Sequence, residues 1–231
     1  MTSNSQNAFV FPGQGSQAVG MGKSLADKYP ESRAVFQEVD NALGESLSET
    51  IWDGPDGDLT LTRNAQPALM AVSIAALRAL ETRGITVPTH AACVAGHSLG
   101  EYSALTAASA ISVADAARLL RIRGDAMQDA VAVGDGAMAA ILGLDLDDVA
   151  EIAESASQGE ICAAANDNAS GQVVVSGVKA AVERALDIAR ARGAKRAILL
   201  PVSAPFHCSL MAPAADIMAN ALSAITIDEP A

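Results

Sequence analysis

Short apolar runs alternate with longer segments of helical period along the first half of the chain. The runs predict strands at Ala8–Phe11 and Ala91–Ala95, each followed by helical segments. Helices are expected at Lys23–Tyr29, Ser32–Leu43, Pro67–Arg83, Leu99–Ala108 and Val113–Val131. Strands that lead into helices in this order are typical of an α/β fold with a parallel sheet.

The pattern changes near Gly134 and predicts a second, smaller domain. From there on the apolar runs and helical segments follow the order strand, helix, strand, strand, helix, strand. The expected elements are Ala137–Leu142, Leu146–Ser155, Ile161–Ala164, Gln172–Ser176, Ala180–Arg192 and Arg196–Leu200. This βαββαβ order is ferredoxin-like. We therefore expect a small domain at 133–202, inserted in a large α/β domain formed by 1–132 and 203–231, with a further helix beginning near Pro213.

The large domain is short of strands. It shows two clear strands, whereas sheets usually have about 4 to 6. The segment Ile225–Ile227 resembles the beginning of another strand. We therefore expect a C-terminally truncated chain that lacks strands of its first sheet.

Composition and charge exclude several classes of protein. Half of the residues are hydrophobic and 18% are charged, which excludes disorder. The net charge of −12 and the 3% of aromatic residues argue against nucleic-acid binding. The chain has no apolar run of membrane length and no basic, apolar leader, so we expect a soluble cytoplasmic protein. Its three cysteines are scattered without metal-ligand spacing, and we expect neither metal nor cofactor.

The segment Gly96–Gly100 matches the pattern GxSxG between a predicted strand and a predicted helix. Such glycines allow a turn sharp enough to present the serine hydroxyl above the sheet, so Ser98 is a candidate nucleophile. The Leu99 N–H, at the beginning of the following helix, is a candidate donor to an oxyanion. The alternative is a plain strand-to-helix turn without catalytic function.

A serine nucleophile requires a base, and the chain has three histidines. His97 is adjacent to Ser98 in the turn, and His90 precedes the strand at its opposite end, which leaves His207 in a proline-rich loop after a strand. The alternative is a loop histidine that caps the next helix. Gln14, in the glycine-rich loop after the first strand, is a second candidate oxyanion donor, since that loop lacks the spacing of a nucleotide site.

Arg123 lies on the apolar stripe of its predicted helix. Residues three and four positions away are Leu119, Leu120, Ala126 and Met127, none of which is acidic. A guanidinium that faces the core keeps its charge and requires a carboxylate partner. That carboxylate is either a distant acid of this chain or part of a substrate.

Five segments together resemble the malonyl-CoA:acyl carrier protein transacylases of fatty-acid synthesis. They are Phe9–Gln17, Gly96–Leu105, Arg121–Gln128, Asn166–Val174 and Pro201–His207, in the order of that family. The resemblance begins near residue 8 and extends to the last residue. It implies an α/β-hydrolase-like large domain with an inserted ferredoxin-like domain, and family members continue beyond the position where this chain ends.

The resemblance also implies a role for each site residue. Malonyl-CoA would acylate the nucleophile, and the phosphopantetheine thiol of acyl carrier protein would then take the malonyl group in a ping-pong reaction. The implied residues are Ser98 as nucleophile, His207 as base, Gln14 and Leu99 as oxyanion donors, Arg123 for the malonyl carboxylate, and Asn168 (with Asn166) and Phe206 beside the substrate.

Substrate and partner follow from the same residues. A bidentate arginine discriminates against acyl groups without a carboxylate, so malonyl is expected over acetyl. Phe206 resembles the malonyl-selecting form of its segment and disfavours methylmalonyl. The carrier protein is acidic as a class, and a basic cluster could dock it, or could simply complement the dipole of a helix C-terminus. That cluster comprises Arg184, Arg190, Arg192, Lys195 and Arg196.

Two other functions share these motifs. A serine thioesterase or esterase would use the same turn and hydrolyse the acyl group. A truncated, non-catalytic domain would bind the carrier protein without forming an acyl-enzyme.

Overall fold

The computed structural model describes residues 7–132, 134–202 and 204–231. Three parts of the chain lie outside the described residues: 133 and 203, at the expected domain boundaries, and 1–6, within the N-terminal stretch where no leader was expected. The chain forms two compact units, Met1–Asp125 with Met218–Ala231, and Ala126–Ile217. These units divide the chain within two of its helices, α8 (Val113–Asp129) and α11 (Ala212–Ser223).

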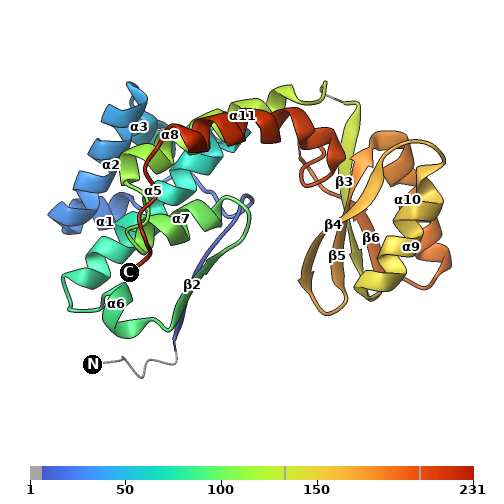
Figure 1. Cartoon of the computed structure of the whole chain (residues 1–231), viewed down its shortest axis with the longest axis horizontal. Coiled ribbons are helices and arrows are strands. Elements are labelled where there is room, and N and C mark those ends of the chain that lie inside the picture. The colour runs from blue at the N-terminus through green and yellow to red at the C-terminus, as the bar shows by residue number, and fades with distance from the viewer. Residues whose placement is uncertain (1–6, 133, 203) are drawn as a thin grey trace. The chain divides into compact units, whose positions relative to one another are not determined.

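A two-stranded parallel sheet lies in the first unit. Strand β1 (Ala8–Phe11) pairs with β2 (Cys93–Gly96), and Phe11 is in register with Gly96. The expected parallel pairing is thus confirmed, with β2 beginning two residues later than its apolar run. Phe11 points into the core, whereas Val10 is 70% exposed. The sheet therefore has one packed face and one open face, and helices cover the packed one (Figure 1).

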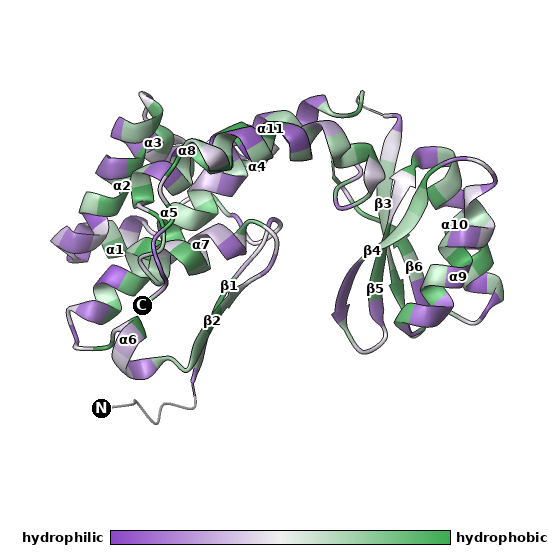
Figure 2. Cartoon of the chain, viewed as in Figure 1, coloured by the Kyte–Doolittle hydropathy of each residue, from purple (hydrophilic) through white to green (hydrophobic). Residues whose placement is uncertain are grey.

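Helices make up the rest of the first unit's core. They are α1 (Lys23–Lys28), α2 (Pro30–Leu43), α3 (Leu47–Asp53), α4 (Asp56–Thr60), α5 (Thr62–Glu81), α6 (Val87–His90), α7 (Gly100–Ala107) and α8 (Val113–Asp129). Among the largest fully buried side chains are Phe36, Ile51, Met70 and Leu120. Hydrophilic and hydrophobic residues alternate in bands along the longer helices (Figure 2), as expected for helices with one buried face.

The expected beginning of the long helix at Pro67 is wrong. Helix α5 begins at Thr62, so Pro67 lies inside it. A proline there removes one backbone hydrogen bond, to the carbonyl of Arg63. The helix still buries Ala65, Ala68 and other residues of one broad apolar face, which outweighs that single bond. The first turn of α5, which the sequence pattern did not reveal, contributes to the site described below.

The second unit holds an antiparallel sheet of order β4-β5-β3-β6. Its elements are β3 (Gly136–Leu142), α9 (Leu146–Ser157), β4 (Cys162–Ala169), β5 (Gln172–Val178), α10 (Lys179–Ala191) and β6 (Arg196–Leu199). Five of these six were expected from the sequence within two residues at each end. The exception is β4, which was expected to end at Ala164 and continues to Ala169, so Asn166 and Asn168 lie in a strand and not in a loop. Helices α9 and α10 cover one face of the sheet (Figure 1), where Ile141, Val175 and Ile152 form an apolar core.

The C-terminal segment contains the 3₁₀ helix η1 (Ser209–Met211) and α11 (Ala212–Ser223). The strand expected at Ile225–Ile227 is wrong, because the segment after α11 forms no strand. Its amides are used elsewhere: Asp228 N–H donates to Ala110 O, and Ala231 N–H donates to Ala108 O, both at 2.9 Å. The chain end is thereby held against the loop after α7.

Two features are absent from the described residues. No helix among them is long and apolar enough to cross a membrane. They also contain no group of three or more His, Cys, Asp or Glu side chains placed to hold a metal ion.

Candidate active site

Ser98 occupies a sharp turn between β2 and α7. Its φ is 55°, in the left-handed region that side chains other than glycine rarely adopt. The turn is closed by hydrogen bonds from Gly100 N–H to His97 O (2.9 Å) and from Glu101 N–H to Ser98 O (3.1 Å). Backbone strain of this kind is typical of a serine presented at the end of a strand and the beginning of a helix.

The two glycines of the motif leave no room for a side chain. A Cβ on Gly96 would lie 1.9 Å from the carbonyl carbon of Gly100. A Cβ on Gly100 would lie 2.4 Å from the carbonyl oxygen of Phe11, at the end of β1. The contacts are with backbone atoms, which cannot move without moving β1, β2 or α7. The glycines therefore allow the close approach that fixes the position of Ser98.

We expect Gly96→Ala to lower the free energy of unfolding by about 3 kcal/mol or more, because the added methyl group overlaps the backbone of α7. Urea denaturation followed by circular dichroism measures this change. Gly57→Ala is the matched control, since a Cβ on Gly57, in α4, meets no atom within 4 Å. Equal stability of the two variants would contradict the close packing at the turn.

The Arg123 guanidinium lies directly beside the Ser98 hydroxyl. Its Nη2 donates to Ser98 Oγ at 3.1 Å, and its Nη1 donates to Gln66 Oε1 at 2.6 Å. Its Cζ also lies 5.9 Å from the centroid of the Tyr102 ring, within cation–π distance. The structure thus brings together two residues that the sequence predicted for one site, and it adds Gln66 and Tyr102.

No carboxylate of the described residues forms an ion pair with Arg123. Burial lowers the pKa of its guanidinium, while the nearby Tyr102 and Glu101 act in the opposite direction. The same burial raises the pKa of the Tyr102 hydroxyl. An arginine cannot lose its proton at ordinary pH, so a partly buried guanidinium without an acid favours binding of an anion. Of the two alternatives for its partner, a distant acid of this chain is not found in an ion pair with Arg123 among the described residues.

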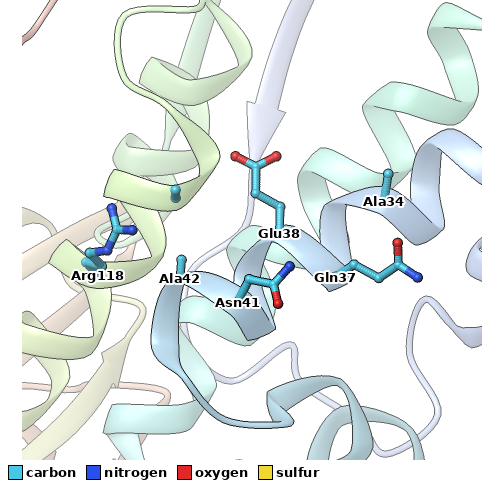
Figure 3. Close-up of a pocket in the computed structure, with 7 residues that line it drawn as sticks. Ala34, Gln37, Glu38, Asn41, Ala42 and Arg118 are labelled. Carbon is cyan, nitrogen blue, oxygen red and sulfur yellow. The ribbon is translucent and has the colours of Figure 1, made fainter.

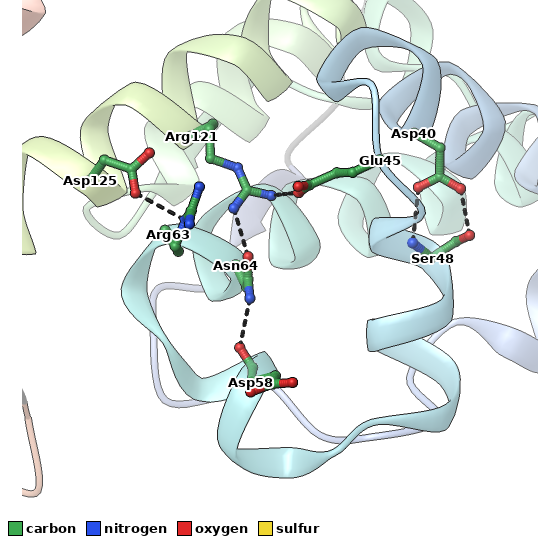
Figure 4. Close-up of polar contacts among 8 residues, drawn as sticks. All are labelled: Asp40, Glu45, Ser48, Asp58, Arg63, Asn64, Arg121 and Asp125. Carbon is green, nitrogen blue, oxygen red and sulfur yellow. Dashed lines mark hydrogen bonds and ion pairs between the residues drawn. The ribbon is translucent and has the colours of Figure 1, made fainter.

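Close packing of α5 against α8 holds Arg123 at this place. A Cβ on Gly124 would lie 2.5 Å from Arg63 Cα, so the two helix backbones nearly touch beside Arg123. On the same side, Arg63 pairs with Asp125 at 3.0 Å. Figure 4 shows that pair next to the Arg121 guanidinium, which donates to Asn64 Oδ1 at 2.6 Å and to Glu45. Residues 121 to 125 are thereby fixed against the first turns of α5.

The two candidate oxyanion donors lie in the same unit as Ser98. Gln14, in the loop after β1, donates from Nε2 to Thr62 Oγ1 at 3.3 Å. Thr62 is buried in the first turn of α5, one helical turn before Gln66. The Leu99 N–H, between Ser98 and α7, donates to no partner among the described residues. It is available to a bound oxyanion.

The other predicted site residues lie in the second unit. His207 is exposed and adopts φ 61°, a strained conformation like that of Ser98. Phe206 beside it is buried in a small apolar cluster with Met138 and Val174. Asn168 is exposed near the end of β4. Each unit thus holds a separate part of the predicted site.

Four of the five residues of the predicted basic cluster lie around the end of α10 and the beginning of β6, whereas Arg184 lies in the middle of α10 and pairs with Glu160 at 2.6 Å. Arg190 pairs with Asp187 at 2.8 Å and Arg192 with Glu151 at 2.9 Å, both at exposed positions. Lys195 and Arg196 are exposed, and neither forms an ion pair with a described residue. The cluster therefore offers at least two cations that no acid in the described part of the chain neutralises.

A surface pocket of about 370 Å³ lies elsewhere in the first unit. Figure 3 shows its lining from α2 and α8, which includes Glu38, Asn41 and Arg118. None of the predicted site residues lines it. We assign it no function.

Sequence reasoning missed Gln66, Thr62 and Tyr102. Gln66 is a buried amide within the apolar run Ala65–Ala71, and that interruption was the signal available in the sequence. Thr62 and Gln66 are four residues apart, so they share one face of α5. Tyr102 follows Ser98 by four residues in the α7 region, but nothing in the sequence alone pairs its ring with Arg123.

A parallel strand, a strained serine turn and the helix after it define an α/β protein with an elbow-type site. The chain belongs to the acyl transferase family, since the family model described as "Acyl transferase domain" matches residues 8–231. The chain is 50% identical over 225 residues to the malonyl CoA-acyl carrier protein transacylase of Escherichia coli K12, covering 97% of this chain and 72% of that protein. The Bacillus subtilis transacylase is 47% identical over 226 residues, covering 97% and 70%.

Solved structures give the same result. The acyl-carrier-protein-S-malonyltransferase of Bartonella henselae superimposes with a TM-score of 0.94 at 58% identity, over 96% of this chain and 71% of that one. A malonyl-transacylase solved in complex with its type II PKS acyl-carrier protein superimposes with a TM-score of 0.92 at 45% identity, over 96% and 71%. The recognised family and the mixed α/β fold, with one parallel and one antiparallel sheet, are thus confirmed.

Proposed function

We propose that this chain transfers a malonyl group from malonyl-CoA to the phosphopantetheine thiol of acyl carrier protein, through an ester on Ser98. The observation that carries the proposal is the 3.1 Å contact between Arg123 Nη2 and Ser98 Oγ, at a guanidinium without a carboxylate partner among the described residues. A cation at this distance suits an acyl group whose far end is a carboxylate. The names of the relatives support the same reaction.

In the first half-reaction, Ser98 Oγ attacks the thioester carbonyl of malonyl-CoA while His207 accepts the hydroxyl proton. The carbonyl oxygen becomes an oxyanion, for which we propose Gln14 Nε2 and the Leu99 N–H as donors. The carbon–sulfur bond then breaks, and His207 returns the proton to the departing CoA thiolate. The products are free CoA and a malonyl ester of Ser98.

In the second half-reaction, the carrier thiol takes the place of CoA. His207 accepts the thiol proton, the sulfur attacks the ester carbonyl, and the proton passes to Ser98 Oγ as the ester bond breaks. The free serine and malonyl-carrier protein result. The same base and oxyanion donors serve both directions, because the two thioesters are chemically equivalent.

Selection of malonyl is assigned to three residues. Arg123 would hold the carboxylate through its planar fork, since its bonds to Gln66 and Ser98 use two of the five N–H groups of a guanidinium. Phe206 would limit the space for an α-methyl group, which disfavours methylmalonyl. Asn168 would lie beside the bound substrate.

We also propose a fold type for each of the two domains. Residues 1–132 and 203–231 would form an α/β-hydrolase-like domain, with a ferredoxin-like domain at 133–202. The order β4-β5-β3-β6, with α9 and α10 on one face, supports the ferredoxin-like description. The turn at Ser98 supports the hydrolase-like one.

Intact-protein mass spectrometry after mixing with malonyl-CoA tests the function. A stable increase in mass equal to one malonyl group, discharged by a pantetheine thiol, is the expected result. Rapid loss of that mass without a thiol would instead identify a thioesterase or esterase. No mass increase, together with retained binding of carrier protein, would identify a non-catalytic binding domain.

For docking of the acidic carrier protein we propose Arg190, Arg192, Lys195 and Arg196. Reversing the charge at Arg190 and Lys195 is expected to raise the KM for carrier protein about tenfold at low salt, because opposite surface charges attract the partners. Transfer to free pantetheine should be unchanged. Lys179→Glu, at the opposite end of α10, is the control. An equal loss with both acceptors would overturn the assignment.

A further inference from the structure

We propose that Gln66 is a positioning residue that sets acyl specificity, because it orients the Arg123 guanidinium through a neutral acceptor and leaves its charge for the substrate. This inference rests on the proposed function and deepens it. The bond from Arg123 Nη1 to Gln66 Oε1, at 2.6 Å, is the shorter of the two bonds of that guanidinium. Gln66 is 1% exposed, so its amide is fixed by the surrounding core.

Arg121, a neighbouring arginine of this unit, shows how an acidic acceptor neutralises a guanidinium. Arg121 lies two residues before Arg123 on α8 and binds both Asn64 and the carboxylate of Glu45 (Figure 4). Its charge is therefore matched within the chain. The Arg123 guanidinium donates to an amide oxygen from the same region of α5, but it pairs with no carboxylate of a described residue. Its charge is held in place without being neutralised.

The side chain at position 66 determines whether the charge of Arg123 remains available to a substrate, because it lies against the guanidinium. The near contact of Gly124 with Arg63 Cα holds α8 close to α5, and Gln66, one turn after Arg63, is buried, so a side chain at 66 stays near Arg123. A carboxylate there would form a buried ion pair with the guanidinium and compete with a substrate carboxylate. A side chain without an acceptor would leave the guanidinium less firmly oriented beside Ser98.

The test is Gln66→Glu, assayed with malonyl-CoA and acetyl-CoA by formation of the acyl-enzyme. We expect kcat/KM for malonyl to fall by about 10² and that for acetyl to change by less than about threefold, so the preference between the two acyl groups collapses. Gln66→Met, which removes the acceptor without adding charge, should raise the KM for malonyl about tenfold and leave kcat nearly unchanged.

Asn64→Asp is the matched control, because it places the same new carboxylate on α5 but beside Arg121. Its ratio of malonyl to acetyl use should equal that of the unmodified protein. Thermal unfolding identifies any variant that fails to fold, and the ratio of the two substrates does not depend on the fraction of folded protein.

The outcomes separate the inference from the proposed function. If the unmodified protein forms no malonyl ester, the proposed function fails. If it does, and Gln66→Glu lowers malonyl and acetyl use equally or leaves the preference intact, the function stands and the role of Gln66 is overturned. Loss of the malonyl preference in Gln66→Glu, with retention in Asn64→Asp, supports the inference.

Discussion

Replacing Ser98 by alanine is expected to abolish covalent labelling by malonyl-CoA. The proposed reaction passes through a malonyl ester of this hydroxyl. Direct attack of water on malonyl-CoA would leave the protein without a covalent malonyl group. Transfer to pantetheine should fall by at least about 10³, since loss of a nucleophile removes the covalent pathway entirely. Intact mass after mixing with malonyl-CoA measures the first effect, and release of CoA thiol measures the second.

The chain offers a close control for this variant. Ser109 also adopts a positive φ, 61°, so Ser109→Ala changes the same residue type in the same backbone conformation. It should retain labelling, because Ser109 lies in the loop after α7 and outside the site. Persistent labelling of Ser98→Ala, or peptide mapping that assigns the malonyl group to another side chain, would contradict the role of Ser98.

Most elements of the second unit were predictable because short apolar runs alternate with amphipathic helices, although β4 continues into the polar segment Asn166–Asn168 beyond its apolar run. The apolar runs of β3, β4 and β5 are bounded by turn residues such as Gly143 and Gly171, and the helices between them keep one apolar face. The strand order could be anticipated only from the order of elements, since pairing of distant strands has no local signal.

The first unit was harder to predict for two physical reasons. Helices α3, α4 and α6 are four to seven residues long, about one to two turns, so each offers little of a helical period to recognise. The predicted beginning of α5 was placed five residues too late, at Pro67, because proline ordinarily occupies the first turn of a helix and not its interior. The segment after α11 has the β-branched residues of a strand, yet its amides bind loop carbonyls.

Within the site, the sequence predicted the candidate catalytic and binding residues but not the residues that hydrogen-bond to them. Ser98 was indicated by its glycines, and Arg123 by its place on an apolar helical stripe. The sequence could not indicate which acceptor meets Arg123, because Gln66 is 57 residues away and reaches it only through the packing of two helices. Such long-range hydrogen bonds arise from tertiary packing, so patterns in a single sequence do not reveal them.

Replacing Arg123 by alanine is expected to lower kcat/KM for malonyl-CoA by about 10² or more while acetyl use is spared or improved. The malonyl carboxylate would lose its fork of N–H donors in a partly buried place, where a charge without a partner is costly. Acetyl has no carboxylate and loses nothing, and removal of the long side chain leaves more room beside Ser98. Acyl-enzyme formation with the two CoA esters, at matched concentrations, measures both effects.

Arg118→Ala is the control and should leave both substrates unaffected, since Arg118 is an exposed residue of the same helix that pairs with Asp115. Arg123→Lys separates charge from geometry, because a lysine keeps the cation but presents a single ammonium group. We expect it to recover only a small part of the malonyl activity, since one ammonium cannot replace two parallel N–H donors. An equal loss of malonyl and acetyl use in Arg123→Ala would mean that the guanidinium supports Ser98 itself rather than the substrate carboxylate.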